Sequence, residues 1–388
     1  MSLLGAILDP GLRQPASCLI EVGPDARDLG TLAALVTSVE ITTSRTEATT
    51  GSIVIEDRRK EDGQWIAADS GLFSRWSPIK VSADFGTRVD EIFRGYITQI
   101  VPSYPNSPGL STLELEVQDE SAALDREHMR TVWGEEAPVA DLDILDALVA
   151  PLGLSRHAQS AQGQSSRVLS QDATPIQFLR ERARANGYEL IFARGEVYFG
   201  PRRLEGQAQA PIMVFAGRAT NCLTFDLADD ALMPDQVRID HAPQNEGATP
   251  ITETLTPDLP VLGDTPAASE GADLGTPSVW RVTKAGDETE EELRARAQAL
   301  VNDYCFKIRG SGELDGSLYG RVLEVGRTVV VDGAGGRYGG LYYVEHVVHR
   351  FTPEGYRQIF ELSRNGTGET AGPSGPISAA ASAVAGLF

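Results

Sequence analysis

The stretch FRGYITQIVPSY at residues 93–104 has a related copy near the other end of the chain, YVEHVVHRF at residues 343–351. Both copies are rich in β-branched and aromatic residues and precede a Pro/Gly break and a second apolar segment, which is typical of a β-hairpin. Such a repeat predicts a duplicated β-domain, although two amphipathic hairpins can also resemble each other by chance. Five positions align without gaps, followed after the break by an aligned triplet: Tyr96 with Tyr343, Ile97 with Val344, Ile100 with Val347, Val101 with Val348, Tyr104 with Phe351, and Leu115-Glu116-Val117 with Phe360-Glu361-Leu362.

Length and charge restrict the classes of protein that fit. The 388 residues suffice for two or three domains. With 34 basic and 55 acidic residues the net charge is −21, which repels phosphate backbones and anionic lipid, so neither specific nucleic-acid binding nor membrane binding is expected. The three cysteines are far apart and favour a reducing compartment. Neither a signal peptide nor a membrane-spanning apolar run is expected.

The N-terminal part has short strand patterns without helices between them. In the segment that starts at Leu113, apolar and polar residues alternate, which is typical of a sheet with one face on a core. Residues 1–119 are therefore predicted to form a first β-barrel, completed by strand-like segments within residues 206–244. Besides the repeated stretch, strand-like segments occur at residues 17–22, 38–43, 51–56, 78–85 and 113–118.

Residues 120–205 change to helical patterns. Apolar residues recur at helical spacing from Asp141 to Leu152, and Thr174-Pro175 opens a second helix that ends at Asn186-Gly187. A hairpin with its turn at Arg194-Gly195 follows. The segment is predicted to be a small α/β insert.

An acidic stretch separates this part from the C-terminal region. Residues 245–278 contain five prolines, six acids and no Lys or Arg, which indicates a partly mobile linker. Residues 279–365 are predicted to form the second β-barrel. A capping box at Thr289 starts a helix there, and strands are expected at residues 305–308, 318–322 and 327–331 before the repeated hairpin.

Two motifs resemble ligand-binding sites, one for phosphate and one for zinc, but neither has the spacing or the context that such a site needs. The glycine-rich run at residues 332–340 lacks the lysine and the following helix of a phosphate-binding loop, so a hairpin turn is expected. His346 and His349 are three residues apart on a predicted strand, where their side chains point to opposite faces, so an architectural role is expected and not a zinc site. The sequence predicts no catalytic, metal-binding or cofactor-binding residue and no cofactor.

Three motifs follow one another along the chain. Residues 172–188 are a predicted helix before a hairpin, residues 320–349 combine a turn, a strand and a second strand that ends at His349, and Gly355-Tyr356 comes next. In this order they resemble the phage late control protein D family and the hub region of VgrG-type spike proteins, with His349 and Gly355-Tyr356 at the positions of the family's histidine and Gly-Tyr. Val325-Gly326 stands where the family usually has Pro-Gly.

The resemblance implies a structural baseplate hub of a contractile injection machine and not an enzyme. The family's subunits carry two barrels similar to the tail-tube protein, and three subunits form a ring of six barrels. The implied fold is mainly β with an α/β insert and two tail-tube-like β-barrel domains related by internal duplication. The implied partners are two further copies in a homotrimer, a spike or needle protein, the tail-tube protein and baseplate wedge proteins. Assembly is expected in the cytoplasm of the producing bacterium, in a phage tail, tailocin or related particle.

The chain departs from VgrG-type proteins after Asn365, where only 23 residues remain, so a separate spike protein is expected. Residues 366–388 are predicted to be a flexible Gly/Ala/Ser tail that leaves the ring on the spike side, or an ordinary disordered terminus. An alternative to the hub is a carbohydrate-active or glycan-binding β-protein, which the many strands and acids support. The residues expected to dock onto the spike are Ile377, Val384, Leu387 and Phe388.

Overall fold

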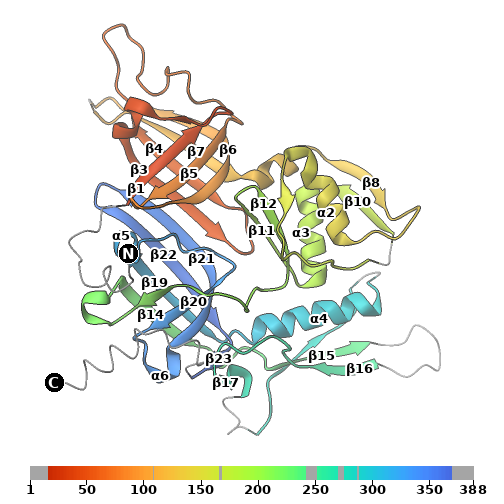
Figure 1. The fold of residues 1–388 in the computed structure, drawn as a ribbon. Helices are drawn as coiled ribbons and strands as arrows, with labels where there is room; N and C mark the ends of the chain where they lie inside the picture. Colours follow the sequence, from red (N-terminus) through yellow and green to blue (C-terminus); the bar gives the residue numbers. More distant parts are fainter. Residues whose placement is uncertain are drawn as a thin grey trace, which may run out of the picture.

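The computed structural model describes residues 16–107, 109–165, 168–241, 251–269, 275–285 and 288–368. The fold is mainly β, and a 13-stranded sheet runs through an N-terminal and a C-terminal region. Figure 1 shows the N-terminal region in red and orange above the C-terminal region in blue, with an α/β unit in yellow and green beside them.

The N-terminal region contributes seven antiparallel strands in the spatial order β3-β4-β7-β6-β5-β1-β2. Their core side chains include Ile41, Ile53 and Leu115, which are fully buried. Since alternate residues of a strand face opposite sides, the residues between these lie on the other face, among them Glu40, Ser52 and Glu116. The strands are β1 (Ser17–Val22), β2 (Arg27–Asp28), β3 (Val36–Ser44), β4 (Thr50–Glu56), β5 (Pro78–Asp84), β6 (Val89–Ser103) and β7 (Thr112–Asp119).

The C-terminal region contributes six strands in the order β14-β19-β22-β21-β20-β13. β21 also pairs antiparallel with β3, so the two regions share one sheet. Phe351 and Tyr356 of the C-terminal region pack into the N-terminal core. The strands are β13 (Gln209–Met213), β14 (Cys222–Asp229), β19 (Ile308–Asp315), β20 (Thr328–Asp332), β21 (Gly340–Thr352) and β22 (Gly355–Arg364).

The two regions repeat the same strand order. The sequence β3-β4-β7-β6-β5 in the first corresponds to β14-β19-β22-β21-β20 in the second. One irregularity of each hairpin corresponds as well: the bulge in β6 lies between Ile97 and Gln99, and that in β21 lies between Val344 and His346, the aligned positions. A bulge adds one unpaired residue at a defined place, so matching bulges fix the register of the two copies.

A second pair of bulges agrees with the first. β3 is irregular against β4 between Val36 and Ser38, and β14 is irregular against β19 between Cys222 and Thr224. Counting from these bulges, each residue of β14 has one counterpart in β3. The alignment of the two hairpins therefore extends to the strands beside them.

The insert forms the two predicted helices and the predicted hairpin, together with two short strand pairings that the patterns did not predict. Ile144, Leu145 and Leu148 line the buried side of the first helix. The second helix ends at Gly187, whose φ of +67° suits a residue without a Cβ. The elements are η3 (Glu120–Asp125), β8 (Met129–Trp133), α2 (Asp141–Val149), η4 (Ala150–Leu152), β9 (Ser155–Arg156), β10 (Leu169–Ala173), α3 (Pro175–Asn186), β11 (Glu189–Ala193) and β12 (Glu196–Gly200).

A further unit lies between β14 and β19. Its helix α4 (Glu290–Tyr304) starts at a capping box in which Thr289 Oγ1 accepts a hydrogen bond from the Glu292 N–H. Val301 and Ala297 of this helix pack on a three-stranded sheet. The strands are β15 (Gln236–His241), β16 (Ile251–Leu255) and β18 (Val279–Val282).

Strand pairing differs from the sequence prediction between residues 206 and 282. β13 and β14 pair with β20 and β19 instead of completing the N-terminal region, where β21 occupies the free edge of β3. β18 joins the sheet on α4 and does not start a second barrel. Within the predicted linker, β16 is paired with β15, and the Asn365 side chain donates to Pro260 O and accepts from Leu262 N.

The predicted strand at residues 318–322 is also wrong. The short helix α5 (Gly316–Tyr319) forms there because the Asp315 carboxylate accepts hydrogen bonds from the N–H groups of Ser317 and Leu318. No helix within the described ranges is long and apolar enough to cross a membrane. The remaining short elements are η2 (Gly30–Leu35), η5 (Gly217–Ala219), β17 (Thr265–Pro266), η6 (Ala267–Ser269), α6 (Gly335–Tyr338) and β23 (Gly366–Thr367).

Candidate functional site

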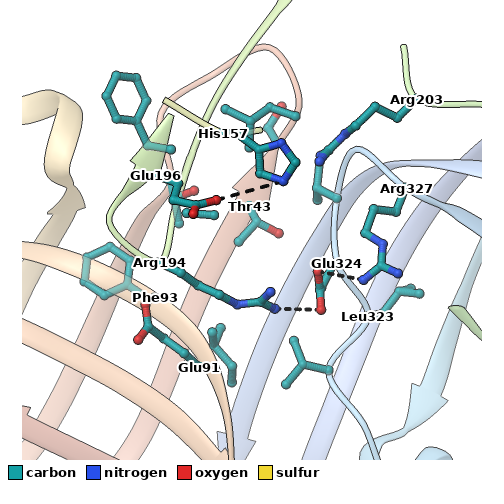
Figure 2. Close-up of a pocket in the computed structure, with 18 of the residues that line it drawn as sticks. Thr43, Glu91, Phe93, His157, Arg194, Glu196, Arg203, Leu323, Glu324 and Arg327 are labelled. Atoms are coloured by element: carbon teal, nitrogen blue, oxygen red, sulfur yellow. Dashed lines mark hydrogen bonds and ion pairs between the residues drawn. The ribbon is translucent and has the colours of Figure 1, made fainter. Parts of the chain in front are cut away.

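A cavity of about 350 Å³ lies where the N-terminal sheet, the insert and the C-terminal region meet. Its walls come from the ends of β3 and β6, the β11–β12 hairpin and the segment 322–328. Figure 2 shows their charged side chains directed toward one space. A hollow between three regions is a usual place for a ligand, so its chemistry decides whether it is a site.

Most charges in this cavity neutralise one another. Arg194 Nη2 lies 2.6 Å from Glu324 Oε1, and Arg327 Nη1 lies 3.1 Å from Glu324 Oε2 (Figure 2). Although burial by itself raises the pKa of Glu324, the two arginines hold it below its ordinary value. Arg94 pairs with Glu91 at 2.7 Å. The Arg194–Glu324 pair joins the insert to the C-terminal region, whereas the Arg94–Glu91 and Arg327–Glu324 pairs each lie within one region.

His157 and Arg203 form the other end of the cavity. Burial, and then the charge of Arg203, lower the pKa of His157, whose Nε2 lies 4.0 Å from Glu196 Oε2. The Arg203 guanidinium lies 4.2 Å above the Tyr198 ring. In the described part of the cavity wall, no serine or threonine side chain is hydrogen-bonded to a histidine or a carboxylate. Across the described ranges, no three His, Cys, Asp or Glu side chains are grouped as metal ligands.

A buried ionic network lies beside the cavity and connects the regions. Arg202 donates to Glu345 Oε1 at 2.8 Å and to Asp303 Oδ1 at 2.8 Å, while Arg45, just after β3, pairs with Glu345 and lies 3.8 Å from Glu189. Burial raises the pKa of Glu345, but Arg202 and Arg45 more than offset this and hold it below its ordinary value. Burial dominates at Glu189 and raises its pKa. The network therefore fastens the N-terminal sheet, the insert, α4 and β21 to one another.

The repeated hairpin residues lie in corresponding places of one sheet. In the sheet order, β3, β4 and β7 lie between β6 and β21. Ile97, Val344 and Val347 are fully buried, whereas Tyr104 is exposed and stacks on Trp65 at 4.5 Å. The tail residues expected to dock onto a spike lie outside the described residues: Ile377, Val384, Leu387 and Phe388.

The histidines and the glycine run are placed within the β-structure. His349 is buried, and its Nδ1 is hydrogen-bonded to the Tyr356 hydroxyl at 2.8 Å. His346 lies opposite Glu361 on β22. The glycine run connects β20 to β21, as predicted for a hairpin turn, and it contains the short helix α6. Burial, and then the charge of His346, lower the pKa of His349 to about 3.

Replacement of His349 by glutamine is expected to flatten the acid limb of the stability profile. The folded protein keeps His349 neutral, while the unfolded chain binds a proton below about pH 6.5, so stability is lost as the pH falls from 6.5 toward 3. In H349Q this slope is expected to fall by about 1.4 kcal/mol per pH unit. Urea unfolding between pH 4 and 7 measures it. The exposed His128 gives the control H128Q, and equal slopes in H349Q and wild type would contradict the assignment.

Comparison with solved structures supports a tail-protein fold. The chain is similar to the 43 kDa tail protein of prophage MuSo2 from Shewanella oneidensis, with a TM-score of 0.65 and 14% identity over 90% of this chain and 98% of that chain. It is similar to the tail protein from Neisseria meningitidis MC58, with a TM-score of 0.62 and 13% identity over 91% and 97%. The expected likeness to phage tail proteins is confirmed for the fold.

A secretion-system protein has a related fold. The E. coli c3393 protein, a component of the type VI secretion system described as similar to T4 tail proteins gp27 and gp5, matches with a TM-score of 0.54 and 12% identity over 87% of this chain and 76% of that chain. No curated protein matches the sequence. The family model described as the Alg8 N-terminal domain matches residues 28–353. Because this match spans most of the chain, the protein belongs to the Alg8 N-terminal domain family.

Proposed function

We propose that the protein is a structural, non-enzymatic hub at the baseplate of a contractile injection machine, where it joins the tail tube to a separate spike. The observation that carries this is the repeat of one strand order, with matching bulges, in both β-regions. It supports an internal duplication into two tail-tube-like units, one built on β1–β7 and the other on β13, β14 and β19–β22. The folds of the tail proteins and of the secretion-system protein agree with this role.

The proposal includes the partners that the resemblance implies. Three copies with two units each present six similar surfaces, which suits contact between a six-fold tube and a three-fold spike. Tail-tube and baseplate wedge proteins are the other neighbours, and the segment after Gly368 is proposed to bind the spike. The internal cavity is then a junction between regions, in line with the Arg194–Glu324 pair that links the insert to the C-terminal region.

Native mass spectrometry is expected to show a homotrimer, alone or with the spike protein present. The reason is that each chain contributes two similar units, so three chains suffice for a ring of six units. Measurement over a range of concentrations separates weak assembly from none. A stable dimer as the end state would contradict the proposal.

The polar face of the shared sheet is proposed to line the channel of the ring. Along one row, residues of seven strands lie opposite one another, and all of them are polar: Asp315, Arg357, Arg350, Glu40, Ser52, Glu116 and Gln99. From β14 to β7 the carboxylates on this face are Glu40, Glu56, Glu114, Glu116, Asp226, Glu313, Asp315 and Glu361, against Arg309, Arg350 and Arg357. An acidic wall repels DNA and acidic cargo during transit.

Electron cryomicroscopy of the assembled ring is expected to place Glu40 and Glu116 on the channel wall. Both carboxylates lie on the side of the sheet opposite to the core, because their neighbours Ile41 and Val117 are buried. A map with this face on the outside, or with a neutral or basic channel, would contradict the proposal.

A further inference from the structure

The contact between the two β-regions uses half of one strand edge. β21 has β22 on one side along most of its length. Its other side is shared, since β20 pairs with residues 340–343 and β3 pairs with residues 346–351. The second half of β21 thus carries the whole strand contact between the regions.

β6 has partner strands in the same positions as β21, except that half of one edge has none within the described chain. β7 occupies one side, and β5 pairs with residues 89–96 on the other. The following residues, 99–104, align with residues 346–351 of β21. On that side no strand of the described chain pairs with them. Pro102 lies within this segment, and a proline is tolerated on the edge of a sheet because it has no N–H to donate.

β14 has an open edge too, and it is the counterpart of β3. β3 lies between β4 and β21, whereas β14 pairs with β19 and is the last strand of the sheet in the described chain. An open edge of eight residues is a ready template for another strand. The matching bulges align Val39 with Phe225, Glu40 with Asp226, and Ile41 with Leu227.

Side chains that are covered at the contact within the chain are exposed at the two open edges. Ile41 of β3 is 0% exposed, but its counterpart Leu227 is 36% exposed. Phe351 of β21 is 7% exposed, but its counterpart Tyr104 is 49% exposed. Apolar exposure therefore occurs where a repeat of the same contact would remove it.

We propose that β14 of one molecule pairs antiparallel with the end of β6 of a second copy, and so repeats the β3–β21 contact between molecules. This rests on the proposed ring and identifies its interface. The contact is heterologous, so it extends the sheet from copy to copy until rotation closes it. The register follows from the two alignments: Ile100 opposite Asp229, Val101 opposite Ala228, Pro102 opposite Leu227, Ser103 opposite Asp226, and Tyr104 opposite Phe225.

Disulfide formation between separately purified S103C and D226C proteins tests this register. Both positions are exposed, so the variants are expected to fold. Opposed residues of an antiparallel pair have Cα atoms about 4.5–5.5 Å apart, within disulfide range. After mixing and mild oxidation, a disulfide-linked dimer of the two variants is expected. Wild type, oxidised in parallel, gives the background from Cys18, Cys222 and Cys305.

Two matched controls define the geometry. A mixture of S103C with A228C places the cysteines on diagonal positions about 7–8 Å apart, so much less dimer is expected. The double variant E40C/R350C carries the equivalent pair within one chain, where Glu40 and Arg350 are opposed, and is expected to form an internal disulfide.

Native mass spectrometry of the same samples separates the possible failures. Self-association without the S103C–D226C disulfide would overturn the proposed interface and leave the ring in place. Equal dimer yields from D226C and A228C would overturn the register. Absence of any self-association, with the spike protein added, would overturn both the interface and the ring.

Discussion

Replacing Arg364 by methionine is expected to lower the free energy of unfolding by about 3–5 kcal/mol. Arg364 is 0% exposed, although arginine is rarely buried so completely. Its guanidinium donates to Leu262 O, to Gly339 O at 2.7 Å and to Gly368 O, and lies 5.3 Å from the Tyr342 ring. Methionine fills a similar volume but cannot donate to these three carbonyl oxygens. The free-energy cost of leaving them without a donor is expected to exceed the gain from no longer burying a guanidinium.

The matched control for R364M is R350M on the neighbouring strand β21. Arg350 pairs with Glu40 at 2.8 Å, but its side chain is 44% exposed. An exposed ion pair contributes at most about 1 kcal/mol, so R350M is expected to unfold close to wild type. Urea unfolding followed by circular dichroism measures both variants. Similar midpoints for R364M and R350M would contradict a structural role for the buried guanidinium.

Replacing Arg202 by methionine is expected to cost about 3–5 kcal/mol of stability at neutral pH. The side chain is 7% exposed, bonds Glu345 and Asp303, and lies 3.9 Å above the Phe306 ring. Its removal leaves the largely buried carboxylate of Glu345 paired with Arg45 alone, whereas the Asp303 side chain is 53% exposed. Breaking one side of a buried ion pair costs more than the pair contributes, because an uncompensated charge stays in the interior.

The effect of R202M is expected to depend on pH. In wild type the lowered pKa of Glu345 contributes stability above the pKa of an unfolded glutamate and loses it as the pH falls. Without Arg202 this contribution is reduced, so the gap between variant and wild type is expected to narrow as the pH falls below about 4.3, the pKa of an unfolded glutamate. The exposed pair of Arg294 with Glu253 provides the control R294M. A gap that is independent of pH would contradict the electrostatic account.

The sequence predicted local elements better than strand partners. The capping box at Thr289 and the turn at Arg194-Gly195 depend on neighbouring residues, and both form as expected. β14 instead has strand character that is equally compatible with either region. Its partner depends on which strand edges remain open once β21 has paired with β3, and spacing along the chain contains no such information.

The buried network was missed for the same physical reason. Arg45 and Glu345 are 300 residues apart in the sequence, and neither stands in a motif that marks it as buried. The helix α5 shows the opposite case, since the capping carboxylate of Asp315 is visible in the sequence, but the segment after it was predicted to be a strand. Asp315, a residue type that is common at the N-cap, was the signal in the sequence that could have indicated the helix.

The pairing of β3 with β21 has a consequence for synthesis. Thr43 on β3 meets Val347 on β21 across 304 residues, so the first strand exists long before its partner. At about 5–20 residues per second, a ribosome needs on the order of 15–60 s to cover that distance. During this time the edge of β3 is open to any strand in the cell. Correct folding of the N-terminal region therefore depends on how well a nascent chain protects that edge until β21 emerges.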